Sequence, residues 1–469
     1  MLTYNFDKRG EKPIYEWLYE CMKNDILDGK IKAGEKLPSK RSLARHLEIS
    51  VITVENAYAQ LMVEGYVYGV EKKGYFVSRL EERIDQPKEP PREKCEEQHK
   101  KKYRYDLTAN STGVDHFPFS VWAKLLRKVL SEKKTEILMR SPYQGIQELR
   151  EAISLHLYHF RGMSVEPSRI IVGAGTEYLY GVLIQLLERD KIYGVENPGY
   201  QKIRKIYEKN DVQCRYLSLD KSGLSLTELE KNDVQIVHIS PAHHFPTGIV
   251  MPIKRRQELL RWAVQEEGRY IIEDDYDSEF RFTGRPIPTM QSIDQQERVI
   301  YINTFSKTIS PSIRISYLVL PEHLMERYNR ELSFYSCTVP AFEQYTLAEF
   351  MKHGYLEQHI NRMRNYYRSQ RDALIDALEK SSLADQMEIM EEDAGLHFLV
   401  NICTDRSLEE LKRRVEAAGV RLAWLDEYYY EPLAYPPTTA VFNYSGISRE
   451  DISKVLKVLS EAVEGKTIP

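Results

Sequence analysis

The sequence predicts an α/β protein that starts with a small winged helix-turn-helix and continues into a much larger domain. Three observations predict this fold class. Three short helical patterns and a hairpin pattern fill the first 80 residues, and a segment of charge and proline follows them. Beyond that segment, strand and helix patterns alternate, which is typical of a sheet with largely parallel strands. At 469 residues the chain also exceeds what one hydrophobic core supports.

These patterns divide the chain into three parts. We expect a winged helix-turn-helix domain over residues 1–80, a linker over residues 81–104, and a larger α/β domain over residues 105–469. The linker sequence, EERIDQPKEPPREKCEEQHKKKYR, contains too few apolar residues to fold alone. The domains on its two sides are therefore free to sit apart or to pair across a dimer.

Composition limits the possible partners and locations. The net charge of −4 gives no overall attraction to nucleic acid, although residues 30–46 carry six lysines and arginines against one acid, Glu35. The five cysteines are scattered without a C-x-x-C pair, which indicates free thiols in a reducing compartment and no zinc site. The N-terminus has no signal pattern and no apolar run has membrane-span length. We expect a cytoplasmic protein without a membrane partner.

The N-terminal helices have recognisable start and stop signals. Ser39 and Ser50 suit helix N-caps, and a helix that follows Ser50 would stop at Gly65. Residues 66–78 alternate around a turn that contains Lys73 and Gly74, as a small wing does. Two short helices joined by a few residues, together with a wing, predict a winged helix-turn-helix.

The second of these helices, residues 50–64, is the candidate recognition helix. A recognition helix fits the major groove, while helix N-termini and basic side chains suit phosphates. A small helical interaction module has a similar pattern, so spacing alone leaves both interpretations open. The candidate DNA-binding residues are Ser39, Arg41, Arg45, Ser50, Thr53, Asn56, Lys73 and Gly74.

The segment AGEKLPSKRSLARHLEISVITVENAYAQLMVEGYVYGVEKKGYFV resembles the GntR-type winged helix. The matching features are LPS-x-R-x-LA, TV-x-x-AY-x-x-L-x-x-EG, and a glycine followed by an aromatic residue and valine in the wing. This resemblance implies binding to a double-stranded DNA operator. One position departs from the family: Val51 stands where an arginine usually follows the serine that opens the recognition helix. The operator sequence is expected to differ accordingly.

A lysine in the larger domain suggests carbonyl chemistry. A lysine that is kept deprotonated can form a Schiff base, and Lys307 lies among small hydroxyl residues in TFSKTISPSIR. Pyridoxal 5'-phosphate also needs an acid at its ring nitrogen, a donor for its phenolic oxygen and a stacking ring. In RYIIEDDYD, strand alternation places Asp274 and Tyr276 on one face, and ENPGYQ places Tyr200 on a turn.

The phosphate of this cofactor also has candidate contacts. VGAGTEYLY puts small residues between a strand and a helix, where backbone N–H groups and the helix dipole attract phosphate. Hydroxyl and arginine side chains near Lys307 complete an anion site. Each motif alone has an ordinary interpretation as a turn, a bend or an acidic loop, but their order together favours a cofactor site. The candidate phosphate contacts are Ala174, Gly175, Thr176, Thr304, Ser306 and Arg314.

This order of motifs resembles the fold-type I aminotransferases, and more closely the MocR/GabR regulators that join such a domain to a GntR winged helix. The blocks HFPFSVWAKLLRKVL, PAHHFPTGIVMP, IIEDDYDSEFRF and AGLHF carry the resemblance over nearly the whole chain. It implies a mainly parallel sheet flanked by helices and a smaller C-terminal lobe. It also implies that Lys307 forms the Schiff base, Asp274 pairs with the ring nitrogen, Tyr276 contacts the phenolic oxygen, Tyr200 stacks and Arg314 lies near the phosphate.

Three positions depart from these families. Phe245 replaces the asparagine of the N-P-T-G turn, Pro437 stands where a carboxylate-binding arginine is expected, and Lys202 replaces the second arginine of the γ-aminobutyrate regulator. The segment from residue 425 to 448 is instead crowded with tyrosines, including Tyr430. Lys202 and Tyr430 are therefore the candidate effector-binding residues. Our hypothesis is an effector other than γ-aminobutyrate: a different amine or a B6 vitamer.

Three functions compete at this stage. The first is a transcriptional regulator that senses a small amino compound through aldimine chemistry at Lys307. The second is an active aminotransferase with an accessory DNA-binding arm, and the third is a plain repressor whose large domain only dimerises. The missing carboxylate clamp argues against the second, because transamination needs a rigidly held substrate. The lysine, the aspartate and the tyrosine argue against the third. Family analogy implies a head-to-tail, domain-swapped homodimer, and weak transaminase activity remains open.

Overall fold

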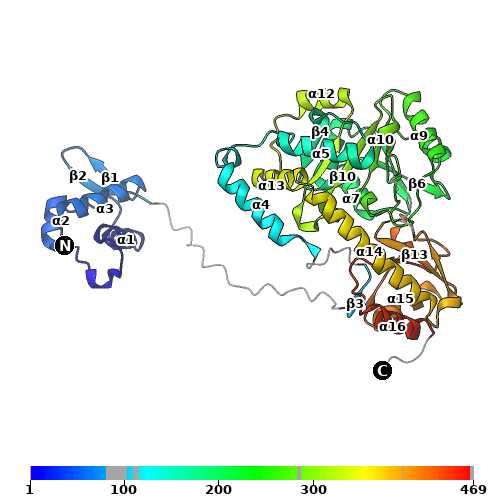
Figure 1. Cartoon of the computed structure of the whole chain (residues 1–469). Helices are drawn as coiled ribbons and strands as arrows, with labels where there is room; N and C mark the ends of the chain where they lie inside the picture. Colours follow the sequence, from blue (N-terminus) through cyan, green and yellow to red (C-terminus); the bar gives the residue numbers. More distant parts are fainter. Residues whose placement is uncertain (1, 81–102, 109–115, 283–286, 393–394, 465–469) are drawn as a thin grey trace. The chain divides into compact units, whose positions relative to one another are not determined.

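The computed structural model describes residues 2–80, 103–108, 116–282, 287–392 and 395–464. The chain divides into two compact units, Met1–Lys100 and Lys101–Pro469 (Figure 1). The predicted linker falls on residues 81–104, of which 81–102 lie outside the described residues. Within the described ranges, no helix has both the length and the apolar character needed to cross a bilayer.

The smaller unit is a winged helix-turn-helix, as predicted. Its wing is an antiparallel hairpin in which Val67 pairs with Val77. Ser39 accepts a hydrogen bond from the Ser42 N–H at 3.1 Å and Ser50 accepts one from the Thr53 N–H at 3.0 Å, so both serines cap helices. The elements are α1 (Ile14–Leu27), α2 (Lys40–Leu47), α3 (Val51–Val63), β1 (Val67–Val70) and β2 (Gly74–Val77).

The core of this unit follows helical periodicity. Val54, Ala57, Tyr58 and Leu61 of α3 are all buried, as their spacing predicts. On α1 the buried stripe is Leu18, Met22 and Ile26, a strict four-residue repeat, whereas Ile14 at the helix start is 36% exposed. Ile14 is exposed because it lies at the first position of the helix, beyond the core.

The larger unit is built on a mixed, mainly parallel sheet of eight strands. Its order is β4-β11-β10-β9-β8-β5-β6-β7, and every neighbouring pair from β10 to β6 is parallel. Strand β11 pairs antiparallel with both β10 and β4. The strands are β4 (Ile170–Gly173), β5 (Ile192–Asn197), β6 (Gln213–Asp220), β7 (Gly223–Leu224), β8 (Ile236–Ile239), β9 (Tyr270–Asp274), β10 (Val299–Thr304) and β11 (Ser316–Val319).

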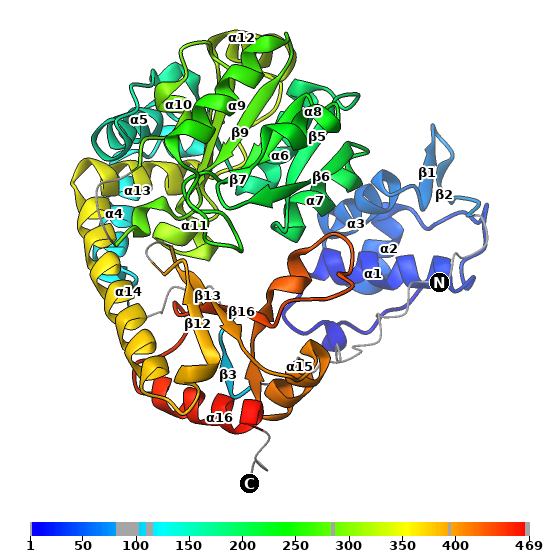
Figure 2. The same ribbon diagram turned by 90° about the vertical axis from the view of Figure 1, so that its right-hand side faces the viewer.

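Helices cover both faces of this sheet (Figure 2). Ile272 and Ile300 pack into one buried cluster with α6 and α12, while Ile271 and Val299 pack into another with α9. The central strands are consequently apolar on both sides, as parallel strands usually are. The helices up to the end of the sheet are α4 (Phe119–Glu132), α5 (Gln147–Arg161), α6 (Thr176–Leu187), α7 (Gln201–Lys209), α8 (Leu226–Lys231), α9 (Ile253–Gln265), α10 (Met290–Ile293), α11 (Phe305–Thr308) and α12 (Glu322–Glu331).

The C-terminal part forms the expected smaller lobe, but it contains a second sheet besides its helices. Strand order in this sheet is β12-β13-β16-β15, with antiparallel pairing throughout. A two-stranded parallel pair joins β3 (Tyr105–Asp106) to β14 (Val420–Arg421). The other elements are α13 (Ala341–Lys352), α14 (Tyr355–Glu379), β12 (Met387–Met390), β13 (His397–Ile402), α15 (Leu408–Ala417), β15 (Ala423–Trp424), β16 (Thr439–Asn443) and α16 (Ile452–Glu464).

A buried ion pair fixes the chain just after β9. Arg161, the last residue of α5, approaches the Asp275 carboxylate to 2.8 Å, and their side chains are 2% and 1% exposed. The Tyr301 hydroxyl donates a further hydrogen bond to Asp275 at 2.6 Å. Because the carboxylate lies away from water, it depends on these partners.

We expect Arg161→Met to lower the free energy of unfolding by about 3–5 kcal/mol, since the buried Asp275 carboxylate would lose its compensating charge. Urea unfolding of the full-length protein measures the loss. In the matched double variant Arg161→Met/Asp275→Leu no unpaired charge remains, so part of the stability should return. A single variant as stable as the parent would contradict this assignment.

Candidate functional site

A cavity of about 460 Å³ opens in the larger unit beside the ends of β5, β9 and β10. It brings together residues that lie more than two hundred positions apart in the sequence. Ala174 and Gly175 are not part of its wall. The predicted site residues that line it are Thr176, Tyr200, Lys202, Asp274, Tyr276, Thr304, Ser306, Lys307, Arg314 and Tyr430.

Asp274 ends β9 and is 6% exposed. Its Oδ2 accepts a hydrogen bond from the Tyr180 hydroxyl at 2.6 Å and lies 3.4 Å from Nε2 of His238. Its Oδ1 is buried without a protein hydrogen-bond partner among the described residues. Since an unpaired buried carboxylate oxygen is costly, this atom is poised to accept a hydrogen bond from a ligand in the cavity.

Lys307 lies on the short helix α11, directly after β10. Burial lowers the pKa of its ammonium group to about 8, and the nearby Asp277 carboxylate opposes this shift only in part. About a tenth of the amine is therefore neutral at pH 7, far more than at the usual pKa of a lysine, and a nucleophilic lysine requires this neutral form. Thr304 caps α11: its hydroxyl accepts from the Ser306 N–H at 3.1 Å.

Two aromatic side chains on the wall frame the space near Lys307. Tyr200, at the start of α7, is 49% exposed and meets the Phe245 ring edge-on, with ring centroids 5.8 Å apart. The Tyr276 hydroxyl lies 3.2 Å from Nδ1 of His243. Phe245 itself lines the cavity, so the position where related enzymes carry an asparagine contributes only an apolar ring.

The turn before α6 differs from the expected phosphate cradle. The Ala174 N–H donates to the Thr338 hydroxyl at 2.9 Å, and the Gly175 N–H donates to the Gly173 carbonyl at 2.9 Å. Gly175 has φ +92°, and a Cβ atom there would overlap the guanidinium of Arg314. The turn thus leaves room for Arg314 at the wall, and Thr176 is the residue of this turn that lines the cavity.

The candidate effector-binding residues make internal contacts. Lys202 forms an ion pair with Oε1 of Glu177, whose Oε2 lies 3.4 Å from the Arg314 guanidinium. Hydrogen bonding to Lys202 lowers the pKa of Glu177. Tyr430 stacks on Tyr216 with ring centroids 3.5 Å apart. Lys202 is therefore paired with Glu177 at the exposed edge of the cavity, and Tyr430 is part of an aromatic wall.

Sequence reasoning missed several residues of the wall. Tyr180 lies one helical turn after Thr176 on α6, and the alternation of side chains along β8 assigns His238 to one face of the sheet. Periodicity therefore offered a signal for both residues. Glu196 also lines the cavity, and burial raises its pKa to about 8. No sequence signal pointed to Asn443, which comes from the end of β16 in the C-terminal lobe.

The smaller unit presents a basic, exposed surface. Arg41 and Arg45 on α2, Asn56 on α3 and Lys73 in the wing are all exposed. Arg41 and Arg45 form no hydrogen bond or ion pair with the described residues, in contrast to Lys40, which binds Glu55 at 2.6 Å. Thr53 shares a hydrogen bond of 2.8 Å with the capping Ser50. Val51 opens α3 with 43% exposure.

Comparisons with known proteins match both units. Residues 105–456 match the family described as aminotransferase class I and II, and residues 14–77 match the gntR family of bacterial regulatory proteins. Domains of the aminotransferase class typically bind pyridoxal phosphate, and a gntR helix-turn-helix implies DNA binding. A solved kynurenine aminotransferase of Pyrococcus horikoshii has a TM-score of 0.68 at 23% identity, over 79% of this chain and 93% of its own. The fold-type I architecture is thereby confirmed.

Full-length relatives have the same two-part organisation. The chain is 36% identical over 452 residues to the uncharacterised HTH-type transcriptional regulator YdeL of Bacillus subtilis, covering 96% of both chains. It is 30% identical to the probable rhizopine catabolism regulatory protein MocR of Rhizobium meliloti, covering 97% of this chain and 95% of that protein. The chain therefore belongs to the MocR family of HTH-type transcriptional regulators, in which a gntR domain is fused to an aminotransferase class I and II domain.

We expect the reactivity of the Lys307 amine in cofactor-free protein to rise with pH through a midpoint at about 8 and then to level off, because only the neutral amine attacks a carbonyl. Pulsed reductive methylation with formaldehyde and cyanoborohydride, followed by peptide mass mapping, measures the midpoint. Exposed Lys454, whose pKa is raised by its hydrogen bond to Asp451, is the internal control. A Lys307 midpoint equal to that of Lys454 would rule out a desolvated amine.

Proposed function

We propose that the chain is a pyridoxal-phosphate-dependent transcriptional regulator that senses a small amino compound, or a B6 vitamer, at Lys307. The observation that carries this proposal is Oδ1 of Asp274, a buried carboxylate oxygen that has no partner among the described residues and lies in the cavity that also contains Lys307. A pyridinium N–H is a donor of the kind this oxygen needs. The shifted pKa of Lys307 supports the same assignment.

The side chains of the cavity fit the cofactor part by part. When bound, pyridoxal phosphate supplies an aldehyde that condenses reversibly with primary amines. Lys307 would hold it covalently, Asp274 would accept its ring N–H, and Tyr276 would donate to its phenolic oxygen. Thr176, Ser306 and Arg314 would receive the phosphate, and Tyr200 would cover the ring. Ala174 and Gly175 would act through the turn that holds Arg314, since their N–H groups have protein partners.

The contacts of Lys202 favour sensing over efficient transamination. An aminotransferase needs its substrate held rigidly while a proton moves, and a bidentate arginine clamp usually does this. Here Lys202 is bound to Glu177, and Pro437 occupies the position of the other clamp residue. An effector carboxylate would have to displace Glu177. This supports an effector that is an amine without a tightly held carboxylate, or a B6 vitamer.

The assembly that we propose is a homodimer arranged head to tail and domain-swapped, with the winged helix of one protomer against the larger unit of its partner. The support is family membership, together with a linker segment long enough to allow the exchange. Light scattering of the full-length protein, combined with crosslinking between the two units of different protomers, tests this arrangement. A monomer would contradict it.

Replacing the lysine provides the central test. The purified parent, reconstituted with pyridoxal phosphate, should absorb visible light, and a panel of amines and B6 vitamers should change that spectrum. Lys307→Ala should lose both the covalently bound chromophore and the response. Its affinity for a mixed-sequence DNA duplex should change by less than about twofold, because DNA binding is carried by phosphate contacts of the other unit.

Lys128→Ala is a suitable control, because Lys128 binds Glu349 on the surface of the same unit and does not line the cavity. If the Lys307→Ala protein still forms a covalent adduct that can be reduced, Lys307 is not the residue that binds the cofactor. A parent protein that stays colourless after reconstitution with pyridoxal phosphate would contradict the cofactor proposal as a whole. Steady turnover of amino acids by the parent would favour the alternative of an active aminotransferase with a DNA-binding arm.

The DNA-binding surface makes a separate prediction. Arg41→Ala should weaken binding to a mixed-sequence duplex by roughly five- to tenfold and reduce the slope of log affinity against log salt by about 1, as loss of a phosphate contact does. Fluorescence anisotropy across a salt series measures both. Lys454→Ala, in the other unit, is the charge-matched control. If both variants bind alike, α2 does not face the phosphate backbone.

A further inference from the structure

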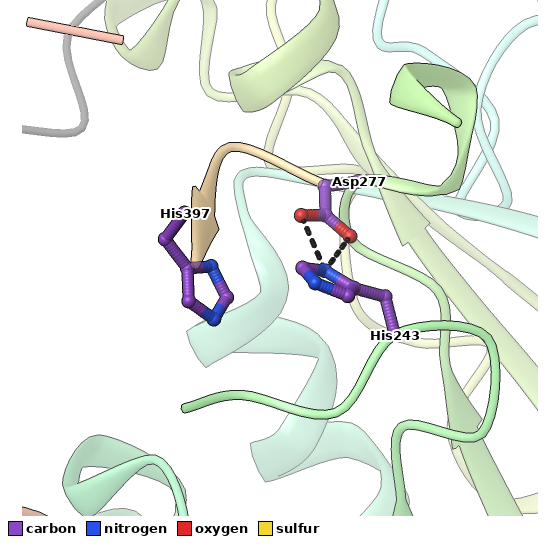
Figure 3. A group of neighbouring side chains, drawn as sticks. All are labelled: His243, Asp277 and His397. Carbon is purple, nitrogen blue, oxygen red and sulfur yellow. Dashed lines mark hydrogen bonds and ion pairs between the residues drawn. The ribbon is translucent and has the colours of Figure 1, made fainter. Parts of the chain in front are cut away.

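A buried cluster lies directly behind Tyr276. His243, Asp277 and His397 are 3%, 2% and 2% exposed, and each comes from a different part of the chain. Figure 3 shows His243 and Asp277 joined by hydrogen bonds, with His397 on β13 beside them. Nδ1 of His243 lies 2.9 Å from Oδ2 and 3.1 Å from Oδ1 of Asp277, and 3.2 Å from the Tyr276 hydroxyl.

These distances determine where the proton of His243 resides. Nδ1 faces two carboxylate oxygens, which can only accept, so Nδ1 must carry a hydrogen. A single N–H donates most strongly to the nearer, charged acceptor, which is Asp277. Nε2 of His243 is buried without a partner among the described residues. A hydrogen on Nε2 would be a buried, unpaired donor, so the geometry favours a neutral imidazole with its only hydrogen on Nδ1.

A consequence follows for Tyr276. Since Nδ1 of His243 already carries a hydrogen, it has no lone pair to accept the phenolic proton. The Tyr276 oxygen, 3.2 Å away, instead accepts a weaker share of this N–H, which fixes the phenol while its own O–H donates elsewhere; the side chain lines the cavity. Burial raises the pKa of Tyr276 well above its usual value, and the carboxylates of Asp277 and Asp274 raise it further. The phenol thus keeps the proton that it would donate.

The backbone around the cluster keeps the pair in place. Gly395 has φ +73°, and a Cβ atom there would overlap the His243 ring and lie 2.7 Å from Oδ2 of Asp277. The Gly395 N–H donates to the Phe280 carbonyl at 3.1 Å, which anchors this segment. The imidazole and the carboxylate are therefore closely packed against Gly395, where no side chain would fit.

We propose that the His243–Asp277 pair is a positioning unit that keeps Tyr276 as a hydrogen-bond donor into the cavity. The pair compensates for Phe245, whose ring offers no hydrogen-bond donor at the position where related enzymes have an asparagine. The inference rests on the proposed function in one respect: the acceptor in the cavity is the phenolic oxygen of the cofactor. His243 touches Tyr276, and Asp277 acts on Tyr276 through His243.

The same three residues raise the alternative of a divalent metal site. One potential ligand atom from each lies within 4.8 Å of the others. The small cavity of about 10 Å³ beside His243 and Asp277 is, however, also lined by Arg161 and Arg281, whose charges oppose a cation. Nε2 of His397 lies 3.0 Å from the Pro246 carbonyl, to which it is placed to donate. A hydrogen-bonded pair accounts for these contacts better than a metal does.

The first test needs no cofactor. Histidine labelled with ¹⁵N in the full-length, cofactor-free protein reports the tautomer of each imidazole by NMR, and the spectrum of a His243 variant assigns the His243 signal. We expect a neutral ring with the hydrogen on Nδ1. A ring with its hydrogen on Nε2 would overturn the proposal, because Nδ1 would then accept from Tyr276. Stoichiometric zinc or manganese bound by the purified protein, and lost on chelation, would overturn it equally.

The second test is a double-mutant cycle on affinity for pyridoxal phosphate, read from the absorption spectrum. His243→Leu and Tyr276→Phe should each weaken binding by roughly tenfold, as the loss of one buried hydrogen bond does. The double variant should be no weaker than either single variant, since both remove one interaction. Additive losses would mean that His243 acts independently of Tyr276.

A conservative variant separates the hydrogen bond from simple packing. The side-chain amide nitrogen of asparagine can occupy the place of Nδ1, so His243→Asn should bind within about threefold of the parent, whereas His243→Leu should not. Equal losses in both variants would contradict the proposal. If the parent itself fails to bind pyridoxal phosphate, the proposed function fails, and the tautomer of His243 still decides whether the pair exists.

Discussion

The parallel pairing of β9 with β10 is the constraint on which the site depends. In this register Asp274 lies beside Ile302, so the chain leaving β10 brings Lys307 to the same edge of the sheet as the end of β9. Strand pleating then separates neighbouring acids: Asp274 faces the cavity, while Glu273 accepts hydrogen bonds from the N–H groups of Met290 and Gln291 on the other side. One run of acidic residues thus supplies both the site and its support.

Burial shifts the pKa values of several titratable groups of the cavity toward the uncharged form. It lowers the pKa of Lys307 and of His244 and raises that of Glu196 and of Tyr276, which favours the neutral form of each group. The exposed side of the cavity differs, because Glu177 there bridges Lys202 and Arg314. A ligand that enters therefore meets neutral donors and acceptors inside and a closed ion pair at the edge, where an added anion must compete with Glu177.

The sequence was sufficient for features that depend on local periodicity or on motif order. The caps at Ser39 and Ser50, the core of α3 and the meeting of Asp274 with Lys307 are of this kind. It did not predict the partners that fix those side chains, such as Tyr180 for Asp274 or Glu177 for Lys202. These pairs form between elements that only the tertiary fold brings together, and no periodic signal encodes them. The antiparallel C-terminal sheet was missed because its short strands lie between stronger helical patterns.

The walls of the cavity suggest how binding there can have consequences elsewhere. A ligand shifts a conformational equilibrium only by as much as it binds one state better than another. Asp274 ends β9 of the large sheet and Lys307 lies on α11 directly after β10, whereas Tyr428 and Asn443 belong to the C-terminal lobe. A molecule that fills the cavity contacts both, so its binding energy depends on their separation.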